Sequence, residues 1–344
     1  MSNARELAQA PNQPGRKNLF FNGDMKIWQR STSTQYVSGV QNAYLTADRW
    51  RTTRSSQATV TQALADDGPT GIRYSLGLTV DVADATLDAG NYEYISQRLE
   101  GWDIQHLNWG TADAKPVTVS FWVKCSETGD FSASLFVYTA GAAASYNIGT
   151  VVTINAADTW EYKTLTFPGF ETTTIAGNNE IALMFAFFTT AGSNFTTTDN
   201  SSWDTYTSGR LAYGQTLNLN GTLNATFRIT GLQLEVGEVA TEFEHISVAE
   251  EQSRCERYYQ YSHTRTIGGG EVNAGGYYEF DSVYLRTFMR GTPTITPIYV
   301  GSARFAAAVP TIATITVNSF GAYAAPTSTG YGYLQYRFTA EAEI

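Results

Sequence analysis

Alternating apolar and polar residues mark several short strands along the chain. The clearest run is 117–125. One of its faces carries only apolar residues, namely Val117, Val119, Phe121, Val123 and Cys125, and the other is polar apart from Trp122. Successive side chains of a strand point to opposite faces, so this run predicts a strand with one face on a core. Strands are also predicted, between polar turn clusters, at 133–139, 160–167, 181–189 and 225–235.

The end of the chain alternates in the same way. Between 333 and 344, one face carries Leu334, Tyr336, Phe338, Ala340, Ala342 and Ile344. A chain end with such regular alternation predicts a strand that pairs with other strands of a sheet. Many short strands, without helices alternating between them, favour antiparallel sandwiches or jelly rolls.

Only two helices are predicted. The first covers residues 2–10 and is stopped by the proline- and glycine-containing linker 11–15. The second begins at Ser247, where Ser247 and Glu250 have the spacing of a capping box, and we expect it to reach about Tyr261. Its face towards a sheet would carry Val248, Cys255, Tyr258 and Tyr259.

These patterns predict an all-β fold, namely an antiparallel jelly-roll sandwich and a smaller C-terminal β-sandwich domain joined by one α-helix. A chain of 344 residues is long for a single core, which also favours two domains. The predicted division is an N-terminal segment 1–17, a jelly roll 18–246, a connecting helix 247–262 and a C-terminal β-domain 263–344.

Charge and hydropathy exclude some classes of partner. The formal net charge is −10 and there is no run of Lys or Arg, so electrostatic attraction to nucleic acid is not expected. The longest apolar run, 181–188, is far shorter than the roughly 18 residues that a membrane helix needs. The polar start, 1–6, lacks the apolar segment of a signal peptide, so we expect synthesis in a cytoplasm.

Known catalytic and metal-binding patterns are missing from the sequence. His106, His245 and His263 do not have metal-ligand spacing, and there is no P-loop, dinucleotide fingerprint or nucleophile elbow. Cys125 and Cys255 are interpreted as buried free thiols, with a disulfide as the alternative. We therefore expect a protein that is not an enzyme. A glycosidase stays open as an alternative, because two carboxylates facing a cleft need no sequence motif.

Several islands of sequence resemble a family of phage and prophage tail and fibre proteins. The islands are 18–25 with 28–30, 47–50, 231–237 with 240–244, 255–259, 288–294 and 340–344. The resemblance implies a non-enzymatic structural subunit of a tailed-phage virion, of fibre or decoration type. It also implies a homotrimer, made in the host cytoplasm, whose N-terminus attaches to a portal, tail or capsid protein.

The sandwich of that family is similar to carbohydrate-binding modules, which implies that a host-surface glycan is a candidate ligand. Trp122, on the polar face of its strand, is the candidate glycan contact, and packing against a loop or another subunit is the alternative. The alternative function is that of a carbohydrate-binding module or a glycan-degrading tailspike.

Three further sets of site residues are expected. A structural calcium ion in related sandwiches would here be held by Asp24 and Glu235, whose oxygen ligands suit Ca²⁺; ordinary hydrogen bonds are the alternative. Docking to the particle would involve Leu7, Arg16 and Lys17, unless this segment is a free tail or lies on its own sandwich. Tyr258 and Tyr259 are expected at a subunit or domain interface.

Overall fold

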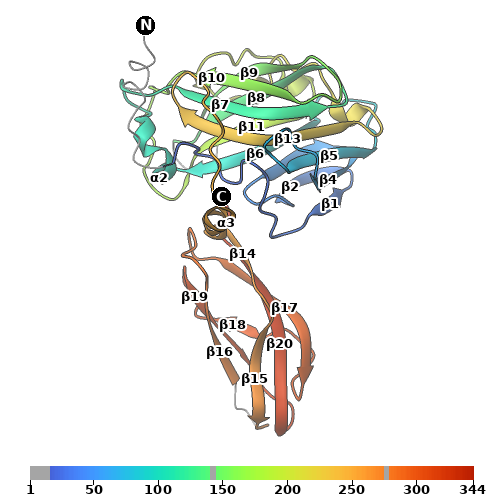
Figure 1. The fold of residues 1–344 in the computed structure, drawn as a ribbon, viewed down its shortest axis with the longest axis vertical. Coiled ribbons are helices and arrows are strands. Elements are labelled where there is room, and N and C mark those ends of the chain that lie inside the picture. The colour runs from blue at the N-terminus through green and yellow to red at the C-terminus, as the bar shows by residue number, and fades with distance from the viewer. Residues whose placement is uncertain (1–15, 140–144, 275–278) are drawn as a thin grey trace.

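The computed structural model describes residues 16–139, 145–274 and 279–344. It contains a broad β-sandwich and a narrower, elongated β-domain, with helix α3 (Val248–Glu256) where they join (Figure 1). All strand pairs in the described ranges are antiparallel, and the predicted all-β fold is confirmed. The predicted first helix and its linker lie outside the described residues.

The sandwich consists of two sheets. In spatial order, the six-stranded sheet contains β1 (Ser33–Tyr36), β4 (Thr59–Ala65), β5 (Ser75–Val82), β13 (Thr226–Val236), β7 (Val117–Cys125) and β10 (Glu161–Phe167). The seven-stranded sheet contains β12 (Asp204–Thr205), β9 (Tyr146–Ile154), β8 (Gly129–Val137), β11 (Ile181–Ala191), β6 (Tyr92–Glu100), β3 (Arg51–Ser56) and β2 (Gly39–Tyr44). Short helical turns follow β6 and the later strands: α2 (Gly101–Ile104), η1 (Gln105–Leu107), η2 (Ser193–Phe195), η3 (Ser208–Arg210) and η4 (Leu219–Gly221).

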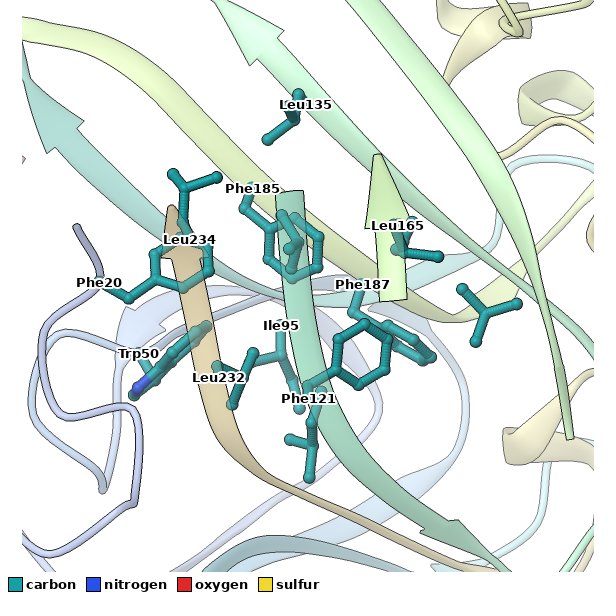
Figure 2. Packing of buried hydrophobic residues seen from close by; sticks show 14 of the residues in the cluster. Phe20, Trp50, Ile95, Phe121, Leu135, Leu165, Phe185, Phe187, Leu232 and Leu234 are labelled. Atoms are coloured by element: carbon teal, nitrogen blue, oxygen red, sulfur yellow. The ribbon is translucent and has the colours of Figure 1, made fainter. Parts of the chain in front are cut away.

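The main core lies between these two sheets (Figure 2). All five apolar residues that the pattern of 117–125 placed on one face are fully buried in it, as predicted. Phe121 packs against Phe185 and Phe187, with ring centroids 6.5 and 5.6 Å apart. Burying each such ring stabilises the fold by about 1.5–3 kcal/mol, so this core accounts for much of the stability of the sandwich.

Strand β11 is buried on both faces. Phe185 and Phe187 face the main core, whereas Met184 and Phe188 belong to a second cluster with Leu211 and Ala212. The segment that contains Leu211 therefore covers the outer side of the seven-stranded sheet. This cover explains why 181–188 is continuously apolar although the sheet is antiparallel.

The C-terminal domain has its own core between two smaller sheets. One sheet pairs β20 (Gly330–Glu341) with β14 (Tyr259–Tyr261), β15 (Arg265–Val272) and β17 (Thr294–Ala303). The other has the order β16 (Glu279–Tyr284), β19 (Ser319–Ala324) and β18 (Thr311–Ala313). The predicted apolar face of the last strand is confirmed for Leu334, Tyr336, Phe338 and Ala340, which are buried. Ala342 and Ile344 lie beyond the end of β20, and Ile344 is partly buried against the core of the sandwich.

Helix α3 is shorter than predicted. The backbone N–H of Glu250 donates to the Ser247 hydroxyl at 3.2 Å, so the predicted N-cap is confirmed. The prediction that the helix reaches Tyr261 is wrong, because residues 259–261 form β14 and pair with β20. Val248, predicted on the buried face, is 61% exposed.

In the described part of the chain, no helix combines the length and apolar character that a membrane span requires.

Candidate functional site

The most densely connected polar cluster lies where the two domains meet. We call it the junction and define it by Arg30, Asp48, Arg49, Glu100, Arg257, Tyr258, Tyr259 and Glu343. Tyr258 is fully buried and Tyr259 is 7% exposed. Both tyrosines, predicted at a subunit or domain interface, thus lie at a domain interface within one chain, where another subunit cannot reach Tyr258.

Glu100 binds the segment that leads from α3 into the C-terminal domain. Glu100 is the last residue of β6, and its side chain is almost fully buried. It accepts hydrogen bonds from the Tyr258 hydroxyl at 2.5 Å and from Arg257 Nε and Nη2 at 3.1 and 2.8 Å. Burial raises the pKa of Tyr258 well above its ordinary value, so this hydroxyl stays a donor. A bidentate guanidinium and a phenol together satisfy an otherwise costly buried charge.

Arg49 occupies the centre of the junction and is fully buried. Its central guanidinium carbon lies 3.5 Å from the centroid of the Tyr258 ring. Its Nη1 pairs with Glu343, and its Nη2 donates to the carbonyl oxygen of Arg98 at 2.6 Å. Arg49 therefore contacts both domains at once.

A second arginine repeats this arrangement beside the first. Arg30 lies over the ring of Tyr259, 3.8 Å from its centroid, and its Nη2 is 3.1 Å from Glu343 Oε1. The Asp48 carboxylate accepts from the backbone N–H of Gln29 at 2.9 Å and from its side-chain Nε2 at 2.5 Å. Burial raises the pKa of Asp48 to about 6. An ionisable group with a shifted pKa often marks an active site, but here it belongs to a closed structural network.

The end of the chain is held in the same place. The hydroxyl of Tyr44 donates to the Ile344 carbonyl at 2.6 Å, and Arg290 Nε donates to the Ala342 carbonyl at 2.9 Å. The side chain of Asn179 donates to the Arg290 carbonyl at 2.8 Å. The segments that carry the family resemblance, from both ends of the chain, thus meet in one junction.

Trp122 lies on the outer face of the six-stranded sheet and is half-buried, as its strand pattern predicts. Tyr162 lies opposite it on β10, with ring centroids 5.2 Å apart and planes inclined by 52°. On its other side Trp122 packs close to Gly231, in the irregular part of β13. Tyr162 is 44% exposed, so the pair presents aromatic surface to solvent.

Polar groups border this aromatic pair. Lys124 Nζ is 2.7 Å from Asp67 Oδ2 and lies 5.2 Å from the centroid of the Trp160 ring. Burial alone would raise the pKa of Asp67, but hydrogen bonds from Lys124 and Ser75 lower it. Aromatic rings can pack against the C–H groups of a sugar ring, and fixed charged and hydroxyl groups beside them can bind its hydroxyl groups.

Asp24 and Glu235, the expected calcium ligands, have separate sets of protein partners. Asp24 Oδ2 is 2.9 Å from Lys26 Nζ. Glu235 accepts from the Gln233 side chain at 2.8 Å and from the backbone and hydroxyl of Thr241 at 2.8 and 2.7 Å. Among residues 16–139, 145–274 and 279–344, no three His, Cys, Asp or Glu side chains gather as a metal site. Ordinary contacts account for both carboxylates, and we propose no calcium site.

The expected docking residues are placed only in part. Leu7 lies outside the described residues. Arg16 pairs with Glu250, and Lys17 Nζ donates to the hydroxyl of Thr241 at 2.6 Å. These two charges are therefore bound to their own chain, as in the alternative in which the segment lies on its own sandwich.

The strongest contacts of the junction were not assigned by sequence reasoning. Arg49 and Glu343 were noted only as members of motifs, and Glu100 follows an ordinary strand pattern. Neither spacing nor composition links them, because their partners are remote in sequence.

Cys125 and Cys255 are free and buried, as predicted.

No protein-family model matches the chain, and no curated protein matches its sequence. Solved structures show weak likeness. The enzymatically active domain of tailspike protein 4 of bacteriophage CBA120 shares 12% identity over 64% of this chain, with a TM-score of 0.34. This chain spans only 21% of the length of that tailspike chain.

A family 11 carbohydrate-binding module of a Clostridium thermocellum cellulase is also similar. It shares 12% identity over 60% of this chain and 100% of the module, with a TM-score of 0.31. A xylan-binding domain from Paenibacillus barcinonensis shares 12% identity over 55% of this chain and 92% of that domain, with a TM-score of 0.28. TM-scores of this size assign neither a family nor a function to the chain.

Proposed function

We propose that this chain is a non-enzymatic structural subunit of a tailed-phage virion, of fibre or decoration type, and that it binds a host-surface glycan. The junction carries the proposal. Segments that resemble phage tail and fibre proteins, although far apart in sequence, converge there on buried and paired charges. Such a network fixes one domain against the other, which a particle subunit exposed to mechanical force requires.

Mass spectrometry of purified particles tests the structural role. The chain should copurify at a constant ratio to the major capsid protein through a density gradient. Recovery only in the soluble fraction of the lysate would contradict the proposal. Release of reducing sugar from host surface polysaccharide by the purified chain would instead favour the alternative, a glycan-degrading tailspike.

The proposed glycan contact is the pair of Trp122 and Tyr162. Its support is the exposed ring of Tyr162 beside half-buried Trp122 on a sheet face bordered by fixed polar groups. On an array of host surface glycans, Tyr162→Ala and Trp122→Ala should lose binding that the wild-type chain shows. Tyr213→Ala, at a 39% exposed tyrosine elsewhere on the sandwich, is the matched control. Equal binding by all variants would exclude this surface.

We also propose that the subunit is a homotrimer. The support is strand β17, which pairs with β20 and carries three consecutive exposed apolar residues, Ile298, Tyr299 and Val300. An apolar strand at a sheet edge promotes pairing with another chain. Light scattering should give a trimer at micromolar concentration, and Tyr299→Lys should shift it towards monomer. A wild-type monomer would contradict this assembly.

Attachment to a portal, tail or capsid protein is proposed to use residues 1–15, with Leu7 as an apolar contact. Arg16 and Lys17 pair with Glu250 and Thr241 of their own chain, so the proposal rests on residues 1–15. Deletion of residues 1–15 should leave folding and oligomeric state unchanged while the chain disappears from purified particles. Normal incorporation of the deletion variant would show that attachment lies elsewhere.

A further inference from the structure

A pocket of about 170 Å³ opens in the C-terminal domain, close to the end of α3. Its lining residues come from β14, the beginning of β15, the end of β16 and β20. Its lining includes Tyr261, His263, Arg265, Tyr284, Arg286 and Phe338. Typical sites for drug-sized ligands have about 300–1,000 Å³, so this pocket suits a single ring rather than a long ligand.

The cationic side of the pocket is held in place by the protein. Arg286 Nη2 donates to the Tyr261 carbonyl at 2.7 Å, and its Nε is 3.1 Å from Glu256 Oε1. Arg265 makes two hydrogen bonds of 2.7 Å to the Asp281 carboxylate. A ligand therefore meets guanidinium groups that are already oriented, which reduces the entropic cost of binding.

Both lining arginines keep donors for a ligand. Among the described residues, Nη1 of Arg265 and Nη1 of Arg286 have no hydrogen-bond or ion-pair partner. Arg337 lies outside the pocket lining and supports it by donating through Nε to the Thr264 hydroxyl and through Nη1 to the Tyr261 hydroxyl, both at 3.1 Å.

The opposite side of the pocket is aromatic. Tyr284 is 77% exposed, and its hydroxyl has no hydrogen-bond partner among the described residues. Phe338 is 4% exposed and forms an apolar part of the lining. A ligand in this pocket must offer an apolar ring face to Tyr284 and hydrogen-bond acceptors to the arginines, because guanidinium N–H groups can only donate.

We propose that this pocket binds the carboxylate-bearing ring of an acidic sugar, of the uronic acid class. The carboxylate accepts from the arginine side, where charge-assisted hydrogen bonds to guanidinium are strong. The ring packs on Tyr284, and its hydroxyls reach the Tyr284 hydroxyl and His263. This site is separate from the Trp122 and Tyr162 pair, which lies in the other domain.

Ligand-observed NMR and calorimetry on the full chain test the proposal with two matched probes. Methyl glucuronide and methyl glucoside differ in the oxidation of a single carbon, so they isolate the contribution of the carboxylate. Methyl glucuronide should bind, and methyl glucoside should bind about tenfold more weakly or not at all. Equal binding of the two sugars would overturn the acidic class, and no binding of methyl glucuronide at millimolar concentration would overturn the site.

Variants locate the binding site. Arg286→Gln and Tyr284→Ala should each weaken methyl glucuronide binding by about tenfold, and both side chains are exposed, so the substitutions should leave folding intact. Tyr331→Ala, at a 64% exposed tyrosine of the same domain, and Arg304→Gln are the matched controls. Unchanged affinity in both pocket variants would overturn the assignment. Trp122→Ala should keep this binding, so the outcome is independent of the glycan surface on the sandwich.

Discussion

Arg49 and Tyr258 are both fully buried, and the guanidinium carbon of Arg49 lies 3.5 Å from the centroid of the Tyr258 ring. One residue precedes β3 of the sandwich and the other follows α3, so their contact spans the boundary between the domains. A cation over a desolvated aromatic ring is worth about 2 kcal/mol or more. The pair therefore contributes directly to the stability of the junction.

Tyr258→Phe should lower the free energy of unfolding by about 1.5–3 kcal/mol, because it removes a hydrogen bond to a charged group. The ring under Arg49 is kept, but the Glu100 carboxylate loses the hydroxyl that donates to it at 2.5 Å. Urea denaturation provides the measurement. Tyr331→Phe, at an exposed position, should change stability by less than about 0.5 kcal/mol. Equal stability of the two variants would show that this hydroxyl does not matter.

Arg49→Met should cost about 3–5 kcal/mol, since it takes from the buried Glu343 carboxylate one of the two arginines that pair with it and also removes the cation over the Tyr258 ring. Burial alone would lower the pKa of Arg49, but the neighbouring Glu343 carboxylate raises it, so the arginine stays charged. The double variant Arg49→Met with Glu343→Gln should lose less than the sum of the single variants. A double-mutant cycle measures this coupling, and strict additivity would show that the two side chains do not act as a pair.

Asp48 should make the junction less stable as pH rises. Burial raises its pKa from an ordinary value of 3.8 to about 6, so the folded state favours the protonated carboxyl. This contribution is fully present below pH 3.8 and is lost as pH rises through about 6. Since each pKa unit corresponds to about 1.4 kcal/mol, the total effect is about 3 kcal/mol.

Asp48→Asn removes this titration. Urea denaturation at pH 4 and pH 8 should therefore show the variant gaining about 2–3 kcal/mol relative to the wild type between the two conditions. Asp113→Asn, at an exposed position, is the control and should show no comparable change. A stability difference that stays constant with pH would mean that Asp48 is ionised in the folded protein at both values.

The strands of the core could be predicted because their signal is local. In 117–125 each apolar residue lies two positions from the next, and that alone places Val119 and Phe121 inside. The polar face was predicted less well: Ser120 and Thr118 are also buried, and the Thr118 hydroxyl donates to the Gly237 carbonyl at 2.8 Å. Alternation specifies the two faces of a strand, but not which chain segment later covers the polar one.

The junction could not be predicted, because its contacts join remote residues. Arg49 and Glu343 are 294 positions apart, and each is of a type that is mostly exposed. The predicted end of α3 was wrong for the same reason. Residues 259–261 leave the helix because β20, some 80 positions further on, offers them a strand partner. Trp122 was placed correctly, whereas its neighbour Tyr162 depends on the register between β7 and β10.

Gly231 determines the shape of the surface around Trp122. Its φ of +63° is unfavourable for other residues, and an added Cβ would lie 2.7 Å from Ile72 Cδ1 and 3.2 Å from Trp122 Cδ1. Gly231→Ala should cost about 1–2 kcal/mol from the backbone conformation, with a further loss from the contact to Ile72. It should also displace the Trp122 ring and weaken any glycan binding that depends on it.

Two comparisons separate these causes. Ile72→Val removes the Cδ1 methyl group that an added Cβ would contact. In this background, Gly231→Ala should lower the free energy of unfolding by less, leaving mainly the backbone contribution. Gly90→Ala is the control, because a Cβ there meets nothing within 4 Å and its φ is not positive. That substitution should be neutral or stabilise by about 0.4–1 kcal/mol through the unfolded state. If Gly231→Ala is as stable as the wild type in urea denaturation, the irregular part of β13 must relax freely, and Trp122 is not held in place by Gly231.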